Sequence, residues 1–235
     1  MGIKLSVIIP TLNESVGIES CLKKLQSLKQ QGHELIVVDG GSEDNTISLA
    51  SPLCDHVIQS KKSRAIQMNS GVAVATGDCY LFLHADTSLP KGIVDSFIAI
   101  NNVEKRWGRF DIKLSGNHYL FRVIEIFMNV RSRLTGVATG DQAVFIGSEL
   151  FHKIKGFPEI AIMEDIAISK TLLKHSKPIC LKENVTSSSR RWEKNGIIKT
   201  ILKMWMMRLL YFFNYDTNKL EKIYSNTHDI WKCRI

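Results

Sequence analysis

His84 and Asp86 are two candidate metal ligands that directly follow a short apolar segment, residues 80–83. Alternate side chains of an extended chain point to the same side, so both are expected to project together where a buried strand ends. Imidazole and carboxylate groups both bind divalent cations in proteins. An ordinary polar turn after a strand uses the same residue types, so this segment alone does not decide between a site and a turn.

Two other apolar segments of the first half also end in polar residues. The first runs into Thr11, Asn13 and Glu14, and the second ends at Asp39, which two glycines follow. In open α/β sheets, ligands bind outside the carboxyl ends of the parallel strands. The three predicted strand ends carry carboxylates and small turn residues that are expected to lie close together. This arrangement favours a binding site over three unrelated turns.

The spacing of apolar residues predicts the elements that position these side chains. Strands are expected within 4–10, 33–39, 54–60 and 79–86, and helices within 13–32, 45–51 and 63–78. Alternating strands and helices are typical of a mostly parallel sheet that helices cover on both faces. We therefore predict an α/β fold with a Rossmann-like sheet. A GxGxxG or GxxxxGK[ST] glycine loop is absent from the sequence, so carboxylates and a metal are expected to hold any bound nucleotide.

The second half of the chain has a different pattern. A strand is expected within 106–114, a helix within 118–136, a strand with a short helix within 139–160, and a helix within 163–175. The last helix starts with Glu164 and Asp165. Carboxylates at a helix N-terminus are stabilised by the helix dipole, so helix capping is the simplest explanation for this pair.

The composition narrows the classes of partner. The 235 residues are 44% hydrophobic and 23% charged, which is typical of a globular protein, and the net charge is +8. That charge predicts anionic partners, whereas the sequence has no nucleic-acid-binding motif. The five cysteines are scattered, without a CxxC pair or a signal peptide, so we expect reduced thiols and a cytoplasmic location, including the inner face of the membrane.

The C-terminal region is basic and amphipathic. Residues 187–210 contain six basic residues and one acidic residue among large apolar side chains, and they are too polar to span a bilayer. Such a helix can lie in a membrane interface, but it can equally pack against its own domain or a second copy of the chain. We place a domain boundary here, with a main domain at 1–195 and a helical extension at 196–235.

Six segments in this order resemble the family 2 glycosyltransferases of the GT-A fold: SVIIPTLNE, IVVDGGSEDNT, SRAIQMNSG, FLHADT, GDQAVF and MEDIAIS. The resemblance covers about residues 4–195. Within the family, the chain is most similar to the short stand-alone transferases found alongside radical-SAM and arsenosugar-type genes. The resemblance implies a nucleotide-sugar donor, expected to be a UDP- or GDP-sugar, and inversion at the anomeric carbon.

The resemblance also implies roles for individual residues. The donor-binding positions are Pro10, Thr11, Asn13, Glu14, Asp39, Arg64, His84, Ala85 and Asp86. Asp86 matches the last residue of the DxD motif, which binds Mn²⁺ or Mg²⁺ on the diphosphate, and Asp165 matches the general base. The positions on the acceptor or diphosphate side are Gly140, Asp141, Gln142, Glu164, Arg191 and Trp192.

Two positions depart from the family pattern. His84 stands where the first DxD carboxylate is expected, and Ser188 replaces the glutamine of the QxxRW motif of processive synthases. We therefore expect the transfer of a single sugar rather than polymer synthesis. Two other functions fit parts of the pattern: a nucleotidyltransferase that makes the sugar donor, and a non-catalytic scaffold on a membrane surface.

Overall fold

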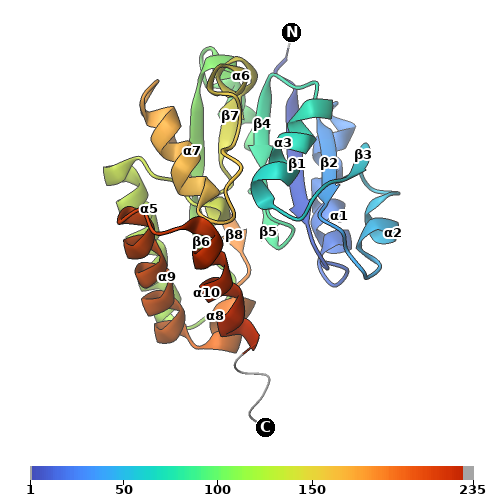
Figure 1. The fold of residues 1–235 in the computed structure, drawn as a ribbon. Helices are drawn as coiled ribbons and strands as arrows, with labels where there is room; N and C mark the ends of the chain where they lie inside the picture. Colours follow the sequence, from blue (N-terminus) through green and yellow to red (C-terminus); the bar gives the residue numbers. More distant parts are fainter. Residues whose placement is uncertain (1, 230–235) are drawn as a thin grey trace.

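Runs of apolar and β-branched residues form the central strands, as the sequence predicts. The computed structural model describes residues 2–229. Its strands are β1 (Leu5–Thr11), β2 (Glu34–Asp39), β3 (His56–Gln59), β4 (Cys79–Phe82), β5 (Thr87–Ser88), β6 (Trp107–Leu114), β7 (Phe145–Gly147) and β8 (Ile179–Ser187). They form an eight-stranded sheet in the order β3-β2-β1-β4-β7-β6-β8-β5 (Figure 1).

Helices occupy most of the connections between the strands. The α-helices are α1 (Ile18–Gln30), α2 (Thr46–Ala50), α3 (Arg64–Val74), α4 (Ile93–Ile98), α5 (Tyr119–Thr135), α6 (Ser148–Ile154), α7 (Glu164–Leu173), α8 (Arg190–Asn195), α9 (Ile197–Phe212) and α10 (Thr217–Asp229). The short 3₁₀-helices are η1 (Val103–Lys105) and η2 (Gly140–Gln142).

The sheet has a parallel half and a mixed half. Strands β3, β2, β1 and β4 are parallel, whereas β7 is antiparallel to both β4 and β6. Strand β8 is parallel to β6, and β5 is antiparallel to β8 at the edge. The prediction of an α/β fold with a mostly parallel sheet flanked by helices is confirmed.

Each face of the sheet has its own apolar core, because successive residues of a strand point to opposite sides. Leu5, Val7 and Ile9 of β1 pack with α1 and α4 on one face. Ile8 of the same strand packs with α3, α6 and α7 on the other face. On α1 the buried residues are those expected from helical spacing: Ile18, Cys21, Leu22, Leu25 and Leu28. The two-sided burial that the apolar strands predict is therefore present.

Strand β4 is shorter than expected and ends at Phe82. His84 and Asp86 lie in the turn that follows, so they are not alternate residues of one strand. The expectation that strand geometry aligns their side chains is therefore wrong. The turn nevertheless places both residues at the carboxyl end of the parallel half.

The C-terminal region forms three helices rather than one. α8 and α9 are separated at Gly196, whose φ of +84° is in the left-handed region, and α10 follows α9. Figure 1 shows these helices grouped at the end of the molecule opposite β3. Among the described residues, no helix is both long enough and apolar enough to cross a membrane. The domain boundary at residue 195 remains a prediction.

Candidate functional site

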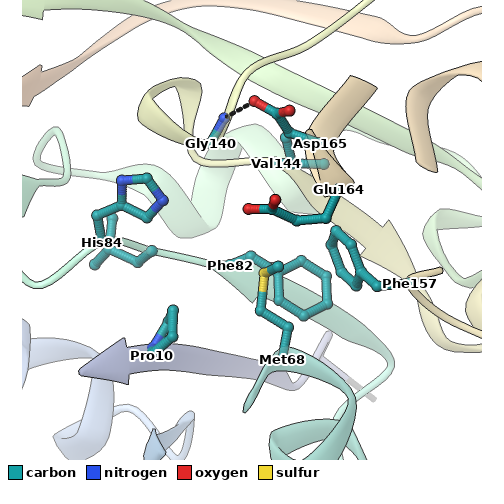
Figure 2. A pocket seen from close by; sticks show the side chains of 10 residues that line it. Pro10, Met68, Phe82, His84, Gly140, Val144, Phe157, Glu164 and Asp165 are labelled. Carbon is teal, nitrogen blue, oxygen red and sulfur yellow. Dashed lines mark hydrogen bonds between the residues drawn. The ribbon is translucent and has the colours of Figure 1, made fainter. Parts of the chain in front are cut away.

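Two adjoining cavities open at the carboxyl ends of β1 and β4, and both are lined by Pro10 and His84. The polar cavity lies between the turn after β4 and the helices α3, α8 and α9. The smaller inner cavity lies between that turn, η2 and the start of α7. Figure 2 shows the residues around the inner cavity.

The structure brings together most of the site residues that the sequence predicts. Those that line one or both cavities are Pro10, Glu14, Arg64, His84, Ala85, Asp86, Gly140, Asp141, Glu164, Asp165, Arg191 and Trp192. They come from both halves of the chain, so the fold is what makes them neighbours.

His84 is fixed between the two cavities by η2. Its Nδ1 lies 3.3 Å from a carboxylate oxygen of Asp141. A Cβ added to Gly140 would lie 2.6 Å from Nε2 of the ring, so the ring packs directly against the glycine. Burial alone would raise the pKa of Asp141, but the hydrogen bond and charge of His84, with Arg64 and Arg191, lower it to about 2. Asp141 is therefore a fixed negative charge at the cavity wall.

Asp165 is held at the first turn of α7 by backbone donors. Its Oδ2 accepts a hydrogen bond from the Gly140 N–H at 3.2 Å, and its Oδ1 accepts one from the Ile166 N–H at 2.7 Å. A carboxylate has about four lone-pair sites, so Asp165 can still accept a further proton or hydrogen bond.

Glu164 lies next to it and projects toward His84 and the inner cavity (Figure 2). This residue is 7% exposed. Burial raises the pKa of Glu164, and the negative charge of Asp165 raises it further, against the opposing effects of Arg64 and His84. The two adjacent carboxylates therefore have different surroundings.

Glu14 and Asp86 both line the polar cavity, and their charges interact. Burial raises the pKa of Glu14, and the nearby charge of Asp86 raises it further, while Arg190, Arg191 and Arg64 oppose the shift. Asp86 is exposed, and the hydrogen bond between its carboxylate and Thr87 Oγ1 is long, at 3.5 Å. Its oxygens are therefore accessible to a ligand.

The donor set fits a cation that is shared with a substrate. Within residues 2–229, no three His, Cys, Asp or Glu side chains are grouped closely enough to form a metal site by themselves. The Nδ1 atom of His84 faces the Asp141 carboxylate, and its Nε2 atom lies beside Gly140. A single accessible carboxylate such as Asp86 is the kind of ligand with which Mg²⁺ is bound together with substrate phosphates and water.

Basic side chains also line the polar cavity. Arg191 at the start of α8 is exposed and donates a hydrogen bond to the Tyr224 hydroxyl of α10. Trp192 lines the cavity and packs against α5 residues. Arg64 at the start of α3 completes the group. Guanidinium groups on the wall of a cavity that also holds Asp86 suit a diphosphate.

Four of the predicted residues do not line either cavity. Thr11, Asn13 and Asp39 organise the loops after β1 and β2. Asp39 is fully buried and accepts hydrogen bonds from the backbone of Gly41 and Ser42 at 2.9 and 2.8 Å. Asn13 joins these loops, because its amide oxygen accepts from Glu43 N–H at 2.9 Å. Gln142 is buried, and its side-chain oxygen accepts a hydrogen bond from the Thr139 N–H. The roles of these four residues toward a donor or an acceptor stay predictions.

Several lining residues are not predicted by the sequence patterns. Thr200 and Met204 come from α9, and Ser187 comes from the end of β8. Thr200 and Met204 are four residues apart and thus share one side of the helix, which is the signal that identifies the inward face. Ser187 carries no distinguishing signal.

Three of the six non-glycine residues with positive φ in the described part of the chain lie in loops near the cavities. Asn13, Ala143 and Met163 have φ values of 54°, 46° and 70°, in the left-handed region that non-glycine residues rarely adopt. Ala143 follows η2, and Met163 directly precedes Glu164. Strain of this kind is common at functional sites, where the surrounding structure over-determines the backbone.

The comparison of sequences points to one family. Residues 6–102 match the model of the family described as "Glycosyl transferase family 2". The chain is 31% identical over 132 residues to a "PGL/p-HBAD biosynthesis glycosyltransferase" of Mycobacterium bovis, a match that covers 46% of this chain and 52% of that protein. The chain therefore spans about half the length of this curated relative.

The fold matches solved glycosyltransferases of the GT-A type. The structure of S. aureus TarS residues 1–349 has a TM-score of 0.64 at 20% identity, covering 80% of this chain and 61% of that one. A mannosyltransferase from Pyrobaculum calidifontis, in complex with GDP-Man and Mn²⁺, has a TM-score of 0.61 at 18% identity, covering 80% and 57%. At these identities the solved structures show that the chain shares the GT-A fold.

Proposed function

We propose that this protein transfers one sugar from a nucleotide-diphosphate sugar to an acceptor hydroxyl, with inversion at the anomeric carbon and with a divalent cation. The observation that carries the proposal is the joining of two cavities at His84. One cavity holds Asp86 and guanidinium groups suited to a diphosphate, and the other holds the carboxylates of Glu164 and Asp165. A donor and an acceptor can therefore meet at their junction.

On the donor side, the residues of the polar cavity would bind the cation and the diphosphate. Asp86 would hold the cation together with the phosphates, and Arg64 and Arg191 would contact phosphate oxygens. A divalent cation bound there supplies stabilisation of the charge that develops on the leaving diphosphate. Complexes of similar folds support this assignment: the mannosyltransferase was solved with GDP-Man and Mn²⁺, and TarS residues 1–349 were solved with UDP-GlcNAc.

On the acceptor side, Asp165 is the proposed general base. Its carboxylate is oriented by two backbone N–H groups and lines the inner cavity, where it can take the proton of the attacking hydroxyl. Glu164, which reaches into the same cavity, would orient the acceptor. His84, held by Asp141, would lie between the diphosphate in the polar cavity and the carboxylates of the inner cavity.

Finer features of the function also remain proposals. The donor is expected to be a UDP- or GDP-sugar, and the acceptor a hydroxyl compound, either a lipid or a small soluble alcohol. The narrower resemblance to the stand-alone transferases near radical-SAM and arsenosugar-type genes likewise stays a prediction.

Two measurements test the proposal: which nucleotide the protein binds, and which phosphate compound it releases. Thermal shift with UDP, GDP, CMP and dTDP, with and without Mn²⁺, should reveal one nucleotide that stabilises the protein in a metal-dependent way. The effect should be lost in Asp86→Ala and kept in Asp95→Ala, which removes an exposed carboxylate of α4 outside both cavities. Release of nucleoside diphosphate from a nucleotide sugar and an acceptor supports a transferase. Release of pyrophosphate from a nucleoside triphosphate and a sugar phosphate would indicate a nucleotidyltransferase. No nucleotide binding under any condition would contradict both.

A further inference from the structure

Helix α5 presents a stripe of large apolar side chains to solvent. The exposed residues are Tyr119, Val123, Ile126, Phe127, Val130 and Leu134. Their spacing of three, four, seven and eight residues places them on one side of the helix. Phe127 is 68% exposed and Leu134 is 82% exposed, so the stripe is not covered by any of residues 2–229.

Helix α9 carries a second stripe with nearly the same spacing. The exposed residues are Ile198, Leu202, Trp205, Met206, Leu209, Phe212 and Phe213. Trp205 is 67% exposed and Phe212 is 70% exposed. The other sides of α9 face the rest of the protein. Thr200 and Met204 line the polar cavity, and Met207 is buried in a cluster with α7 and α10. The stripe is therefore the side of α9 that the described part of the fold leaves without a partner.

The two stripes lie on neighbouring helices, because the inner sides of α5 and α9 meet in one apolar cluster. Phe121, Ile124 and Met128 of α5 share an apolar cluster with Ile197 and Ile201 of α9. We call the combined surface of both stripes the α5–α9 face. Two rows of exposed large apolar side chains on neighbouring helices mark an interaction site rather than ordinary surface.

The charged residues of α5 and α9 are almost all positive. Helices α5 and α9 together contain six basic residues, Arg122, Arg131, Arg133, Lys199, Lys203 and Arg208, against a single acidic residue, Glu125. The Glu125 side chain is only 12% exposed and is engaged by Arg122 and the Leu114 N–H. By helical spacing, Lys199 and Arg208 flank the α9 stripe, and Arg122 and Arg133 flank one side of the α5 stripe. Arg131 and Lys203 turn inward, because Arg131 has buried guanidinium nitrogens and Lys203 donates a hydrogen bond to the Tyr224 carbonyl oxygen. The two helices expose no other carboxylate beside the stripes.

We infer that the α5–α9 face binds the surface of a lipid bilayer that contains anionic lipids. Apolar stripes with Trp and Tyr can enter the interfacial layer while Lys and Arg contact anionic head groups. A second copy of the chain fits less well, because a two-fold interface pairs a patch with itself and would bring the two sets of cations together. This inference goes beyond the proposed function and does not depend on it.

The test uses flotation of the full-length protein with vesicles. The protein should float with phosphatidylcholine vesicles that contain phosphatidylglycerol, and less with pure phosphatidylcholine or at high salt. The triple variant Phe127→Ser/Trp205→Ser/Leu209→Ser should lower the partition coefficient at least about tenfold. The control Val16→Ser/Ile98→Ser removes two exposed apolar residues outside the face and should bind as the wild type does.

A second readout follows Trp205 itself. Its fluorescence should shift to shorter wavelength when anionic vesicles are added, and this shift should be absent in Trp205→Phe while flotation persists. Thermal melting of every variant checks that the fold is intact.

Three results would overturn the inference. They are no flotation of the wild type, equal flotation of the triple variant, or a wild-type dimer that the triple variant converts to a monomer without any vesicle binding. The last result would assign the face to a second copy of the chain. Vesicle binding without nucleotide binding would leave this inference standing and contradict the proposed function, so the two failures are distinguishable.

Discussion

Asp165 and Glu164 are adjacent carboxylates whose different surroundings lead to different expected effects of mutation. Asp165→Asn keeps the size of the side chain but removes the proton acceptor, so kcat should fall about 10²- to 10⁴-fold with little change in donor affinity. Glu164→Gln should have a smaller effect on kcat and a larger one on the KM of the acceptor. Steady-state kinetics of the two variants measures both. If Glu164→Gln abolishes turnover while Asp165→Asn retains it, the base is Glu164.

The raised pKa of Glu164 adds a prediction about pH. A carboxyl group with a raised pKa keeps its proton to higher pH than the ordinary value of 4.5. If the ionised form orients the acceptor, kcat/KM should fall as the pH decreases through this raised pKa, and Glu164→Gln should remove that limb of the profile. An unchanged acid limb in the variant would assign the titration to another group.

Gly140 is the position where a single methyl group should disturb the junction of the two cavities. In Gly140→Ala the new Cβ would clash with His84 Nε2, because the ring lies 2.6 Å from that position. The ring must then leave Asp141, so donor affinity should fall about tenfold while stability changes by about 1–3 kcal/mol. Isothermal titration calorimetry with the nucleotide measures the affinity. The control is Gly17→Ala, whose Cβ would be 3.8 Å from the Ala85 carbonyl oxygen, an ordinary contact. Equal affinities of the two variants would show that His84 does not shape the donor site.

At the scale of single elements, helix α3 depends on a close approach to β1. A Cβ at Gly71 would lie 2.5 Å from the Ile8 Cγ2 atom and 3.1 Å from a Val38 methyl group, so the helix would have to move away from the sheet. We expect Gly71→Ala to destabilise the protein by about 1–3 kcal/mol. Urea denaturation measures the change, with Ser70→Ala at the neighbouring, half-buried position as control. Because α3 begins at Arg64, the variant should also weaken nucleotide binding.

The elements that the sequence predicts best are those whose burial is periodic along the chain. The five buried residues of α1 have helical spacing, and β1 and β2 are apolar runs that the sheet buries on both faces. Strand β8 is not predicted, because Lys182, Glu183 and Asn184 are exposed and interrupt its apolar pattern. Strand β5 has two residues and exists through its pairing with β8, which no local pattern encodes.

Some features of the candidate site can also be predicted from local sequence patterns, and others cannot. His84, Asp86 and Glu14 follow apolar segments, so their place at the carboxyl ends of strands can be argued from the sequence. The contact between His84 and Asp141 cannot, because it joins residues from different halves of the chain. The buried position of Asp39 is also beyond such patterns, because a short turn folds back onto its carboxylate. Patterns locate residues along an element, whereas contacts between loops arise from the complete fold.

At the scale of the whole molecule, the end of the sheet opposite the cavities has a carboxylate that joins three segments. Glu34 of β2 accepts hydrogen bonds from Ser6 Oγ at 2.6 Å and from Thr76 N–H and Oγ1 at 2.9 and 3.0 Å. It thereby links β1, β2 and the loop before β4, the strands that carry the donor side of the site. Burial would raise the pKa of Glu34, but these hydrogen bonds and Lys4 outweigh it and lower the pKa below 4.5.

A lowered pKa makes the contribution of Glu34 depend on pH with a defined sign. The contribution is fully present above the unfolded-state pKa, near 4.5, and it is lost as the pH falls through the lower pKa of the folded state. Glu34→Gln should therefore reduce the free energy of unfolding by about 1–3 kcal/mol at pH 7, because buried donors lose a charged acceptor. The difference from wild type should shrink as the pH decreases below 4.5. Urea denaturation across this range measures it, and Glu104→Gln, at a partly exposed position of η1, is the control. A difference that stays constant with pH would mean that packing rather than ionisation of Glu34 stabilises this end of the sheet.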